Sequence, residues 1–127
     1  MKMNTIEMKT LTINGEEYVR KADVVAANAV NTDGLPYVIC RGYYCGVHAG
    51  YLKKQDGNHC ELVNSRRLWS WRAKKGISLS SVAMHGIRDT ALPCELPTIW
   101  LGDVYEVIPC TARAAETIQK ASIREQA

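Results

Sequence analysis

Residues 37–63, YVICRGYYCGVHAGYLKKQDGNHCELV, decide the fold of this chain. Tyr37–Arg41 is a short apolar run with the composition of a strand, and Val47–Leu52 and His59–Val63 are two further runs of this kind. The Asp-Gly pair at 56–57 is a strong signal for a hairpin turn, and the glycines between the first two runs indicate a bulge or a tight bend. The stretch therefore predicts an antiparallel meander of three strands.

Helical signals follow the meander. Ser78 can cap a short helix that runs to His85, and Thr111 can cap a second helix over 112 to about 123. Between them, Thr98–Ile108 returns to strand composition. Together these segments predict an α+β fold, with a bent antiparallel sheet of about five strands and short helices on one face.

The N-terminal segment predicts a separate appendage. Residues 8–20 alternate apolar and polar side chains around Asn14-Gly15, a strong hairpin turn signal, and 21–30 could form a short helix. The C-terminal helix has a thin apolar stripe, so we expect it to fray or to dock on a partner. The predicted parts are a hairpin-helix appendage at 1–34, a core α+β domain at 35–112 and a C-terminal helical tail at 113–127.

Composition limits the class of protein. A chain of 127 residues is one small domain, and 46% hydrophobic residues are too many for a disordered chain. No apolar run approaches the roughly 20 residues of a membrane helix, and the N-terminus lacks the apolar stretch of a signal peptide. We therefore expect a cytoplasmic protein without membrane contact. A net charge of +3 permits nucleic acid as a partner but does not demand it.

The five cysteines do not predict a metal site. Their odd number, without a secretory signal, is typical of free thiols in a reducing compartment. Cys45, His48, His59 and Cys60 could together supply four zinc ligands on paired strands. Their spacing, however, sends neighbouring side chains to opposite faces of a strand. We predict small buried or half-buried side chains and no metal.

The sequence predicts no catalytic centre and no cofactor. A P-loop, a G-x-G-x-x-G loop, an H-E-x-x-H pair and a nucleophile elbow are all missing from it. A cysteine and a histidine of the meander could act as nucleophile and base, but no orienting third group lies at a recognisable spacing. A binding protein is therefore a better interpretation than an enzyme.

Asn64–Lys75, NSRRLWSWRAKK, places five basic residues and two tryptophans within twelve positions. Guanidinium groups bind phosphate through paired hydrogen bonds, and tryptophan faces stack on bases, so the segment predicts a site for a nucleotide or a single strand. Arg66 and Arg67 are the leading ligand candidates, because arginines at a helix start add to its dipole for an anion. The alternative is that at least one of Trp69 and Trp71 is a core anchor.

The predicted binding surface extends onto the meander. If the three strands form as expected, four of their side chains share the surface of the arginine and tryptophan segment: Arg41, Tyr43, Tyr44 and His48. The strands and thin helices also leave apolar edges, which predict a homo-oligomer in which a second copy covers them.

Five segments occur in an order that resembles a family of small domains of unknown function encoded by tailed bacteriophages and prophages. They are 37–41, 46–52, 64–71, 78–86 and 106–111, and the specific elements are R-R-L-W-x-W and I-P-C-T. The resemblance covers roughly residues 36–112. The family carries small residues after its second tryptophan, whereas this chain has Arg-Ala-Lys-Lys there. The resemblance implies a phage context and assigns no catalytic residue.

These observations predict a non-enzymatic phage or prophage accessory protein that acts against host defence in the host cytoplasm. It would either occupy a host protein or sequester a small anionic nucleotide through the arginine and tryptophan cluster. One alternative is an accessory protein that binds DNA or RNA. Another is a component of the virion or of its assembly.

Overall fold

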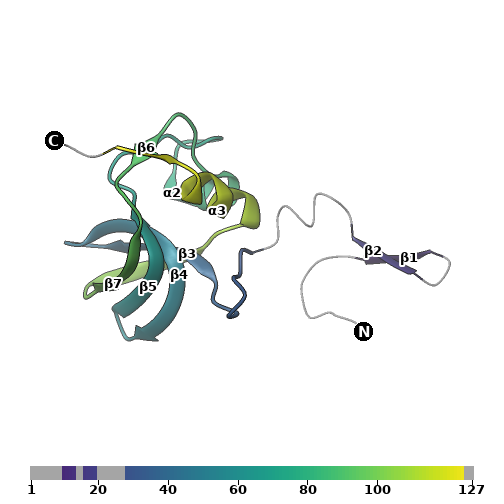
Figure 1. Ribbon diagram of the computed structural model, residues 1–127, viewed down its shortest axis with the longest axis horizontal. Coiled ribbons are helices and arrows are strands. Elements are labelled where there is room, and N and C mark those ends of the chain that lie inside the picture. The colour runs from purple at the N-terminus through teal and green to yellow at the C-terminus, as the bar shows by residue number, and fades with distance from the viewer. Residues whose placement is uncertain (1–9, 14–15, 20–27, 125–127) are drawn as a thin grey trace.

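A computed structural model describes residues 10–13, 16–19 and 28–124 of the chain (Figure 1). β1 (Thr10–Ile13) and β2 (Glu16–Val19) form an antiparallel hairpin, as predicted from the Asn-Gly turn. Most of the helix predicted at 21–30 lies outside the described residues.

The central element is a sheet of five strands. It consists of β3 (Tyr37–Gly42), β4 (Gly46–Asp56), β5 (His59–Arg67), β7 (Leu96–Leu101) and β8 (Val104–Pro109). The spatial order is β7-β5-β4-β3-β8, and every neighbouring pair is antiparallel. The predicted meander and the predicted α+β fold are confirmed.

The sheet curls, and a two-residue connection joins its two outer strands. β7 and β8 lie at opposite edges of the sheet, yet only Gly102 and Asp103 separate them in the chain (Figure 1). Gly42 lies at the same corner, where an added Cβ would come within 2.3 Å of Cys45 Sγ and 2.6 Å of Asp103 Oδ1. The corner therefore closes only around a glycine.

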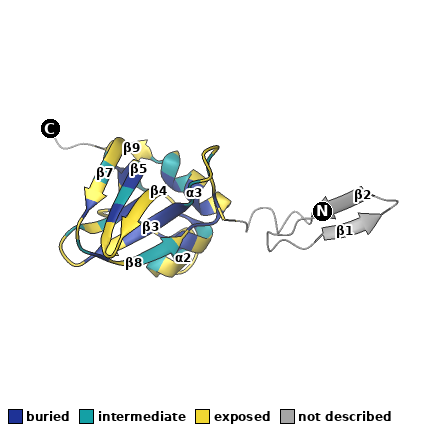
Figure 2. Cartoon of the chain, turned by 90° about the horizontal axis from the view of Figure 1, so that it is seen from below, coloured by how far each residue is buried: buried dark blue, intermediate teal, exposed yellow. Residues whose placement is uncertain are grey.

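The curled sheet has apolar residues on both faces, so the chain has two clusters of core residues. Tyr37 and Ile39 of β3 face the helices, whereas Val38 and Cys40 face the inside of the curl. A strand buried on both faces explains the continuous apolar run at the start of the meander (Figure 2). The inner cluster consists of Val38, Cys40, Cys60, Leu62, Leu101 and Val104.

Two short helices cover the other face. α2 (Leu79–His85) begins after Ser78, whose Oγ accepts from Ser81 N at 3.1 Å. α3 (Ala112–Gln119) begins after Thr111, whose Oγ1 accepts from Ala114 N at 3.1 Å and donates to Met84 O at 2.8 Å. Both predicted caps are present, and the second one also ties the two helices together.

α3 is part of the core, which corrects the predicted tail after residue 112. Ala114, Ala115 and Ile118 are buried in the same cluster as Tyr37 and Ile39. Small alanines suit this position because they let the helix approach the sheet closely, so a thin apolar stripe was a poor guide to burial. The helix also ends earlier than predicted, since the chain continues into β9 (Ser122–Ile123), which pairs in parallel with β6 (Ala91–Leu92).

Arg66 lies in the interior, only 2% exposed, which corrects its prediction as a ligand residue at a helix start. It belongs to β5, and its side chain faces the helices because a bulge changes the alternation of the strand. Val63 pairs with Tyr51, but Ala49 pairs with Arg66 rather than with Ser65. The extra residue is accommodated around Asn64, whose φ is 52°.

The Arg66 guanidinium joins three segments of the chain. Its nitrogens donate to backbone carbonyl oxygens at distances from 2.9 to 3.5 Å. Carbonyls at the end of a helix lack partners within the helix and lie at the negative end of its dipole, so a cation is favourable there. The carbonyls belong to Leu92, Pro93, Ile118, Gln119, Ala121 and Ser122.

Side chains also fix the turn between β3 and β4. The Asp103 carboxylate accepts from the backbone N–H groups of Tyr44 and Cys45. His48 is 1% exposed, and its Nε2 donates to Cys45 O at 2.8 Å. Burial lowers the pKa of His48; the hydrogen bond to Cys45 O opposes this effect in part, and the nearby Arg67 adds to it. The imidazole is therefore neutral in the folded protein at neutral pH.

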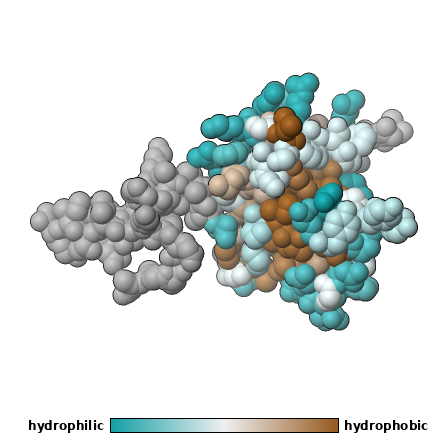
Figure 3. Space-filling view, turned by 180° about the vertical axis from the view of Figure 1, so that it is seen from behind, coloured by the Kyte–Doolittle hydropathy of each residue, from teal (hydrophilic) through white to brown (hydrophobic). Residues whose placement is uncertain are grey.

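One face carries apolar atoms at its centre with hydrophilic residues around them (Figure 3). The described exposed apolar side chains include Ile77 and Met84, beside and on α2. Homo-oligomerisation stays a prediction, which sedimentation of the purified chain would test.

We expect Arg66→Met to destabilise the fold by about 3 kcal/mol or more, because several buried carbonyls lose their donors together. Arg67→Met is the matched control, since Arg67 is exposed and, within the part of the chain that the structure describes, donates a single hydrogen bond, to Cys45 O at 3.3 Å. It should change the free energy of unfolding by about 1 kcal/mol or less. Urea unfolding of both variants tests this, with Arg66→Lys as a milder change if Arg66→Met does not fold. Equal effects at the two positions would contradict the role assigned to Arg66.

We also expect stability to fall as the pH drops below about 6.5, the usual pKa of histidine. The pKa of His48 is lowered in the folded state, so the unfolded chain takes up a proton first and is favoured. The free energy of unfolding should therefore be lower at pH 5.5 than at pH 7.5. Urea unfolding at both pH values should show a smaller pH dependence for His48→Gln than for the wild type. An imidazole NMR titration of His48 with an ordinary midpoint would refute the explanation.

Candidate functional site

Residues 69–74, which we call the tryptophan segment, run beside the chain that follows α2. Lys74 N donates to Gly86 O at 2.8 Å, and Arg88 N donates to Arg72 O at 3.0 Å. Arg72 N in turn donates to Thr90 Oγ1 at 3.1 Å. These bonds hold residues 69–72 opposite residues 89–91, without a regular helix or a long strand in either segment.

A cavity of about 290 Å³ lies between these two segments, and we call it the Trp cavity. Trp69 and Trp71 line it from one side, with Ser70 and Arg72. The opposite wall comes from Asp89–Ala91, and Arg124, just after β9, completes the lining. Its volume is near the lower end of the range of small-molecule sites.

The two tryptophans differ in exposure and therefore in role. Trp71 is half-buried and packs against the core cluster under the helices. Trp69 is 59% exposed, so much of its ring is open to solvent. The expectation that at least one of them is a core residue is met by Trp71. The cavity thus has one fixed aromatic wall and one accessible aromatic ring.

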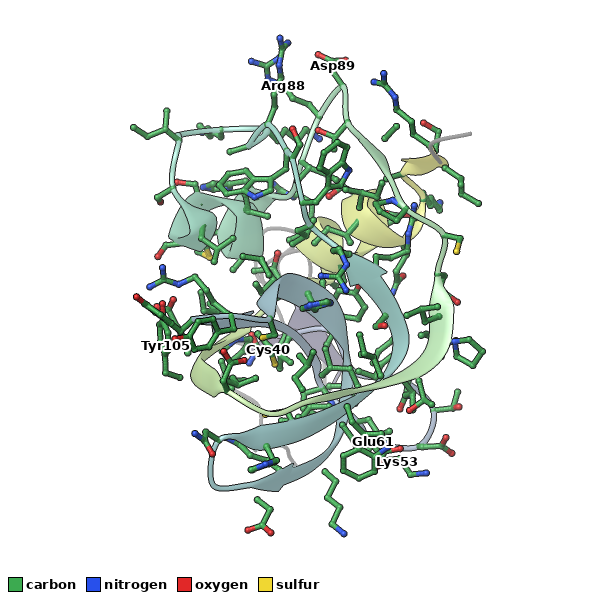
Figure 4. All side chains as sticks on the ribbon, turned by 90° about the vertical axis from the view of Figure 1, so that its left-hand side faces the viewer. Cys40, Lys53, Glu61, Arg88, Asp89 and Tyr105 are labelled. Carbon is green, nitrogen blue, oxygen red and sulfur yellow. The ribbon has the colours of Figure 1, made fainter. Side chains whose placement is uncertain are left out.

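The charges of the cavity are mixed. Arg72 and Arg124 are exposed, and together with Asp89 they give the residues that line the cavity a net charge of +1. Arg88 Nη1 lies 3.0 Å from Asp89 Oδ2 in an exposed ion pair. Figure 4 shows Arg88 and Asp89 pointing away from the body of the molecule, at the end opposite Lys53 and Glu61. The residues that line the cavity are therefore weakly cationic, and the Asp89 carboxylate is directed outward at its rim.

The structure does not bring all the predicted site residues together. Trp69 and Trp71 line the Trp cavity, whereas Arg66 and His48 are buried and engaged with backbone carbonyls. Arg67 is exposed at the end of β5 and donates to the turn between β3 and β4.

The remaining predicted residues belong to a second surface, the aromatic corner, which comprises Arg41, Tyr43, Tyr44 and Tyr105. Arg41 Nε bonds Glu106 Oε1 at 2.7 Å, and its guanidinium lies 5.2 Å from the centre of the Tyr105 ring. The pairing of β3 with β8 shifts register there. Tyr43 and Tyr44 are 73% and 87% exposed, and their rings meet edge to face. Glu106 offsets the charge of Arg41, so this corner is aromatic and close to neutral.

Sequence reasoning singled out Trp69 and Trp71 and missed the other lining residues of the Trp cavity, among them Asp89 and Arg124. Neither lies near a recognisable motif, and both reach the cavity through long-range contacts. Arg124 N donates to Leu92 O at 2.9 Å, beside the short pairing of β6 with β9. A pair of two-residue strands leaves no periodic signal in a sequence.

The thiols of Cys40 and Cys45 are not activated as nucleophiles. Burial raises the pKa of Cys40 to about 12 and that of Cys45 to about 11, so both are protonated at neutral pH. In the part of the chain that the structure describes, no three His, Cys, Asp or Glu side chains gather as metal ligands. Nor is any helix of that part long and apolar enough to cross a membrane.

Comparison with curated proteins and with solved structures finds no match. A family model does match, over residues 35–118. This span begins just before β3 and ends within α3, so it contains the whole five-stranded sheet and every residue of the Trp cavity except Arg124. Because the match covers more than half of the 127 residues, the chain belongs to the family described as Domain of unknown function (DUF6948).

Proposed function

We propose that this protein binds a small anionic ligand with a flat ring, of the nucleotide type, in the Trp cavity. The observation that carries the proposal is the composition of one cavity, in which two tryptophans adjoin two exposed arginines. Such a ligand needs an aromatic face for its ring and guanidinium donors for its phosphate. The proposal keeps the ligand class predicted from the sequence, but it assigns phosphate binding to Arg72 and Arg124 instead of Arg66 and Arg67.

The frame of the cavity favours binding. Trp71 is fixed by the core, and backbone bonds at Arg72 hold the two walls in register. A ligand would therefore order little more than the Trp69 ring and the two arginine side chains, and preformed sites lose less entropy on binding. Stacking of a base on an aromatic ring contributes about 1–3 kcal/mol.

We propose further that the protein is a phage or prophage accessory protein that sequesters a nucleotide signal of host defence in the host cytoplasm. The support is the resemblance of five of its segments to a phage-encoded family, together with the cavity. Sequestration needs affinity and no chemistry, which agrees with thiols that are protonated at neutral pH.

A nucleic-acid strand is the second candidate ligand, favoured by the aromatic corner. Tyr43 and Tyr44 are exposed rings on which bases could stack. Ion pairing of Arg41 with Glu106 leaves this corner little charge for phosphates. Affinity for a strand should therefore depend only weakly on salt if the corner binds it, and steeply if arginines bind its backbone.

We expect a nucleoside monophosphate to raise the melting temperature of the wild-type chain by mass action. At a hundredfold excess over Kd the stabilisation is about 2.7 kcal/mol. Trp69→Ala should weaken binding about tenfold or more, because a stacking face is lost. Trp100→Ala is the matched control, since Trp100 is 60% exposed on β7, outside the cavity, against 59% for Trp69.

The arginines have a matched pair of variants as well. Arg72→Gln should weaken binding, whereas Arg113→Gln, an exposed arginine of α3 outside the cavity, should leave it unchanged. Thermal-shift titrations compare all four variants. If no nucleotide stabilises the wild type, or if the Trp69 and Trp100 variants behave alike, the Trp cavity is not the site.

The phage role has its own test. Expression of the wild-type protein in a bacterium with a nucleotide-signalled defence should restore plaque formation by a phage that this defence restricts. Trp69→Ala should fail to restore it at equal protein level, and Trp100→Ala should succeed. Restoration by neither the wild type nor the control would count against the defence role and leave the binding result standing.

A further inference from the structure

The aromatic corner adjoins a part of the sheet that the helices leave uncovered. Arg41 follows Ile39 by two positions in β3, so the alternation of the strand places it on the face that the helices cover at Ile39. Glu106 pairs with Arg41 across β3 and β8 and therefore shares this face. The two side chains are 44% and 41% exposed. At this end the sheet face is thus open to a partner.

The turn that carries Tyr43 and Tyr44 is held firmly, although both rings are exposed. The Asp103 carboxylate accepts from the backbone N–H groups of Tyr44 and Cys45. Cys45 O in turn accepts from Nε2 of the buried His48 at 2.8 Å. With the backbone fixed, only the two rings remain to be ordered when a partner binds, which lowers the entropic cost of association. Tyrosines presented in this way are typical anchors of protein interfaces.

The charges of the corner limit what can cover it. Arg41 and Glu106 offset each other, so the corner attracts neither a polyanion nor a polycation strongly. A purely apolar partner would take water from this ion pair without replacing its hydrogen bonds, which is unfavourable. The partner that suits the corner therefore presents aromatic side chains together with one cation and one anion.

A second copy of the chain has this composition. Within the described residues, the Arg41 side chain donates one hydrogen bond, from Nε to Glu106 Oε1 at 2.7 Å. Its two Nη groups and Glu106 Oε2 thus keep capacity for a further partner. A two-fold axis at the corner brings each guanidinium opposite the carboxylate of the other copy, in a neutral network of two arginines and two glutamates.

The outer strands of the sheet are less suitable for pairing between copies. β7 contains Pro97 and β8 ends at Pro109, and a proline cannot donate a hydrogen bond to a neighbouring strand. A side-chain surface is therefore a better route to a homodimer than a strand edge.

We propose that the chain forms a two-fold homodimer through the aromatic corner, with Arg41 of each copy bound to Glu106 of the other. The rings of Tyr43, Tyr44 and Tyr105 surround this central network and exclude water from it. Tyr105 already contacts the Arg41 guanidinium, whose carbon lies 5.2 Å from the centre of its ring. The ring therefore holds the guanidinium in place for the second carboxylate.

This interface is separate from the proposed nucleotide site. Figure 4 shows Tyr105 apart from Asp89, which lies at the rim of the Trp cavity. The dimer needs no ligand, so either proposal can fail while the other stands.

Sedimentation equilibrium of the full chain over a range of concentrations tests the proposal. The wild type should change from monomer to dimer as its concentration rises. Arg41→Glu and Glu106→Arg should each raise the dissociation constant about tenfold or more, because each variant places like charges across the interface. An equimolar mixture of the two variants should dimerise again, since the glutamates of one copy then face the arginines of the other.

Two further variants separate the interface from general effects. Tyr44→Ala should weaken the dimer about tenfold or more, as expected for an interface anchor, and its exposed side chain is not part of the core. Lys120→Glu is the control for the charge reversals. Lys120 forms an exposed ion pair with Glu116 at 2.8 Å, outside the corner, so this change should leave the dissociation constant as it is in the wild type.

Three results would each overturn the proposal. They are a wild-type chain that stays monomeric at the highest soluble concentration, a dimer that both charge reversals leave intact, and a mixture of the two variants that does not dimerise. If the wild type is monomeric and Tyr44→Ala lowers its affinity for an oligonucleotide, the corner binds a nucleic-acid strand instead of a second copy.

Discussion

The buried guanidinium of Arg66 is the interaction on which the rest of the structure depends. A charged group without hydration is unfavourable unless hydrogen bonds replace its water, and here backbone carbonyls from 92–93 and 118–122 do so. The partners are dipoles rather than a carboxylate, and two of them, Ile118 and Gln119, belong to the end of α3. One side chain on β5 thus anchors a helix end and two short strands that have few contacts of their own.

This anchoring explains how a surface cavity can be well defined at the end of a small domain. β6 and β9 pair over two residues each, too few to hold the chain by themselves. Arg66 binds the carbonyls of Leu92 and Ser122, one member of each strand. Ala91 and Arg124, which line the Trp cavity, lie one and two residues from these anchors. An interior arginine therefore positions the site without touching it.

The sequence correctly predicted the turns and helix starts that are determined by residues close together in the chain. The Asp-Gly turn and the caps Ser78 and Thr111 act over a few residues, and each is found where expected. Arg66 and Arg67 could not be told apart in this way. Which of two consecutive arginines faces the helices depends on the bulge around Asn64, where the register of β5 against β4 shifts. That shift is a tertiary feature, and because of it the side chain of Arg66 faces the helices and that of Arg67 faces solvent.

Burial separates Arg66 from the arginines that are free to bind a ligand, Arg72 and Arg124. The guanidinium N–H groups of Arg66 donate to backbone carbonyl oxygens, so they are not available to bind an anion. Arg72 and Arg124 are exposed, and their guanidinium groups can bind one. A ligand that touches both would join the tryptophan segment to the chain beyond β9, the region that Arg66 already ties to β5. Ligand binding and the hydrogen bonds of Arg66 therefore stabilise the same arrangement of these segments. Removal of the Arg66 side chain would weaken the site even though the residue lies outside it.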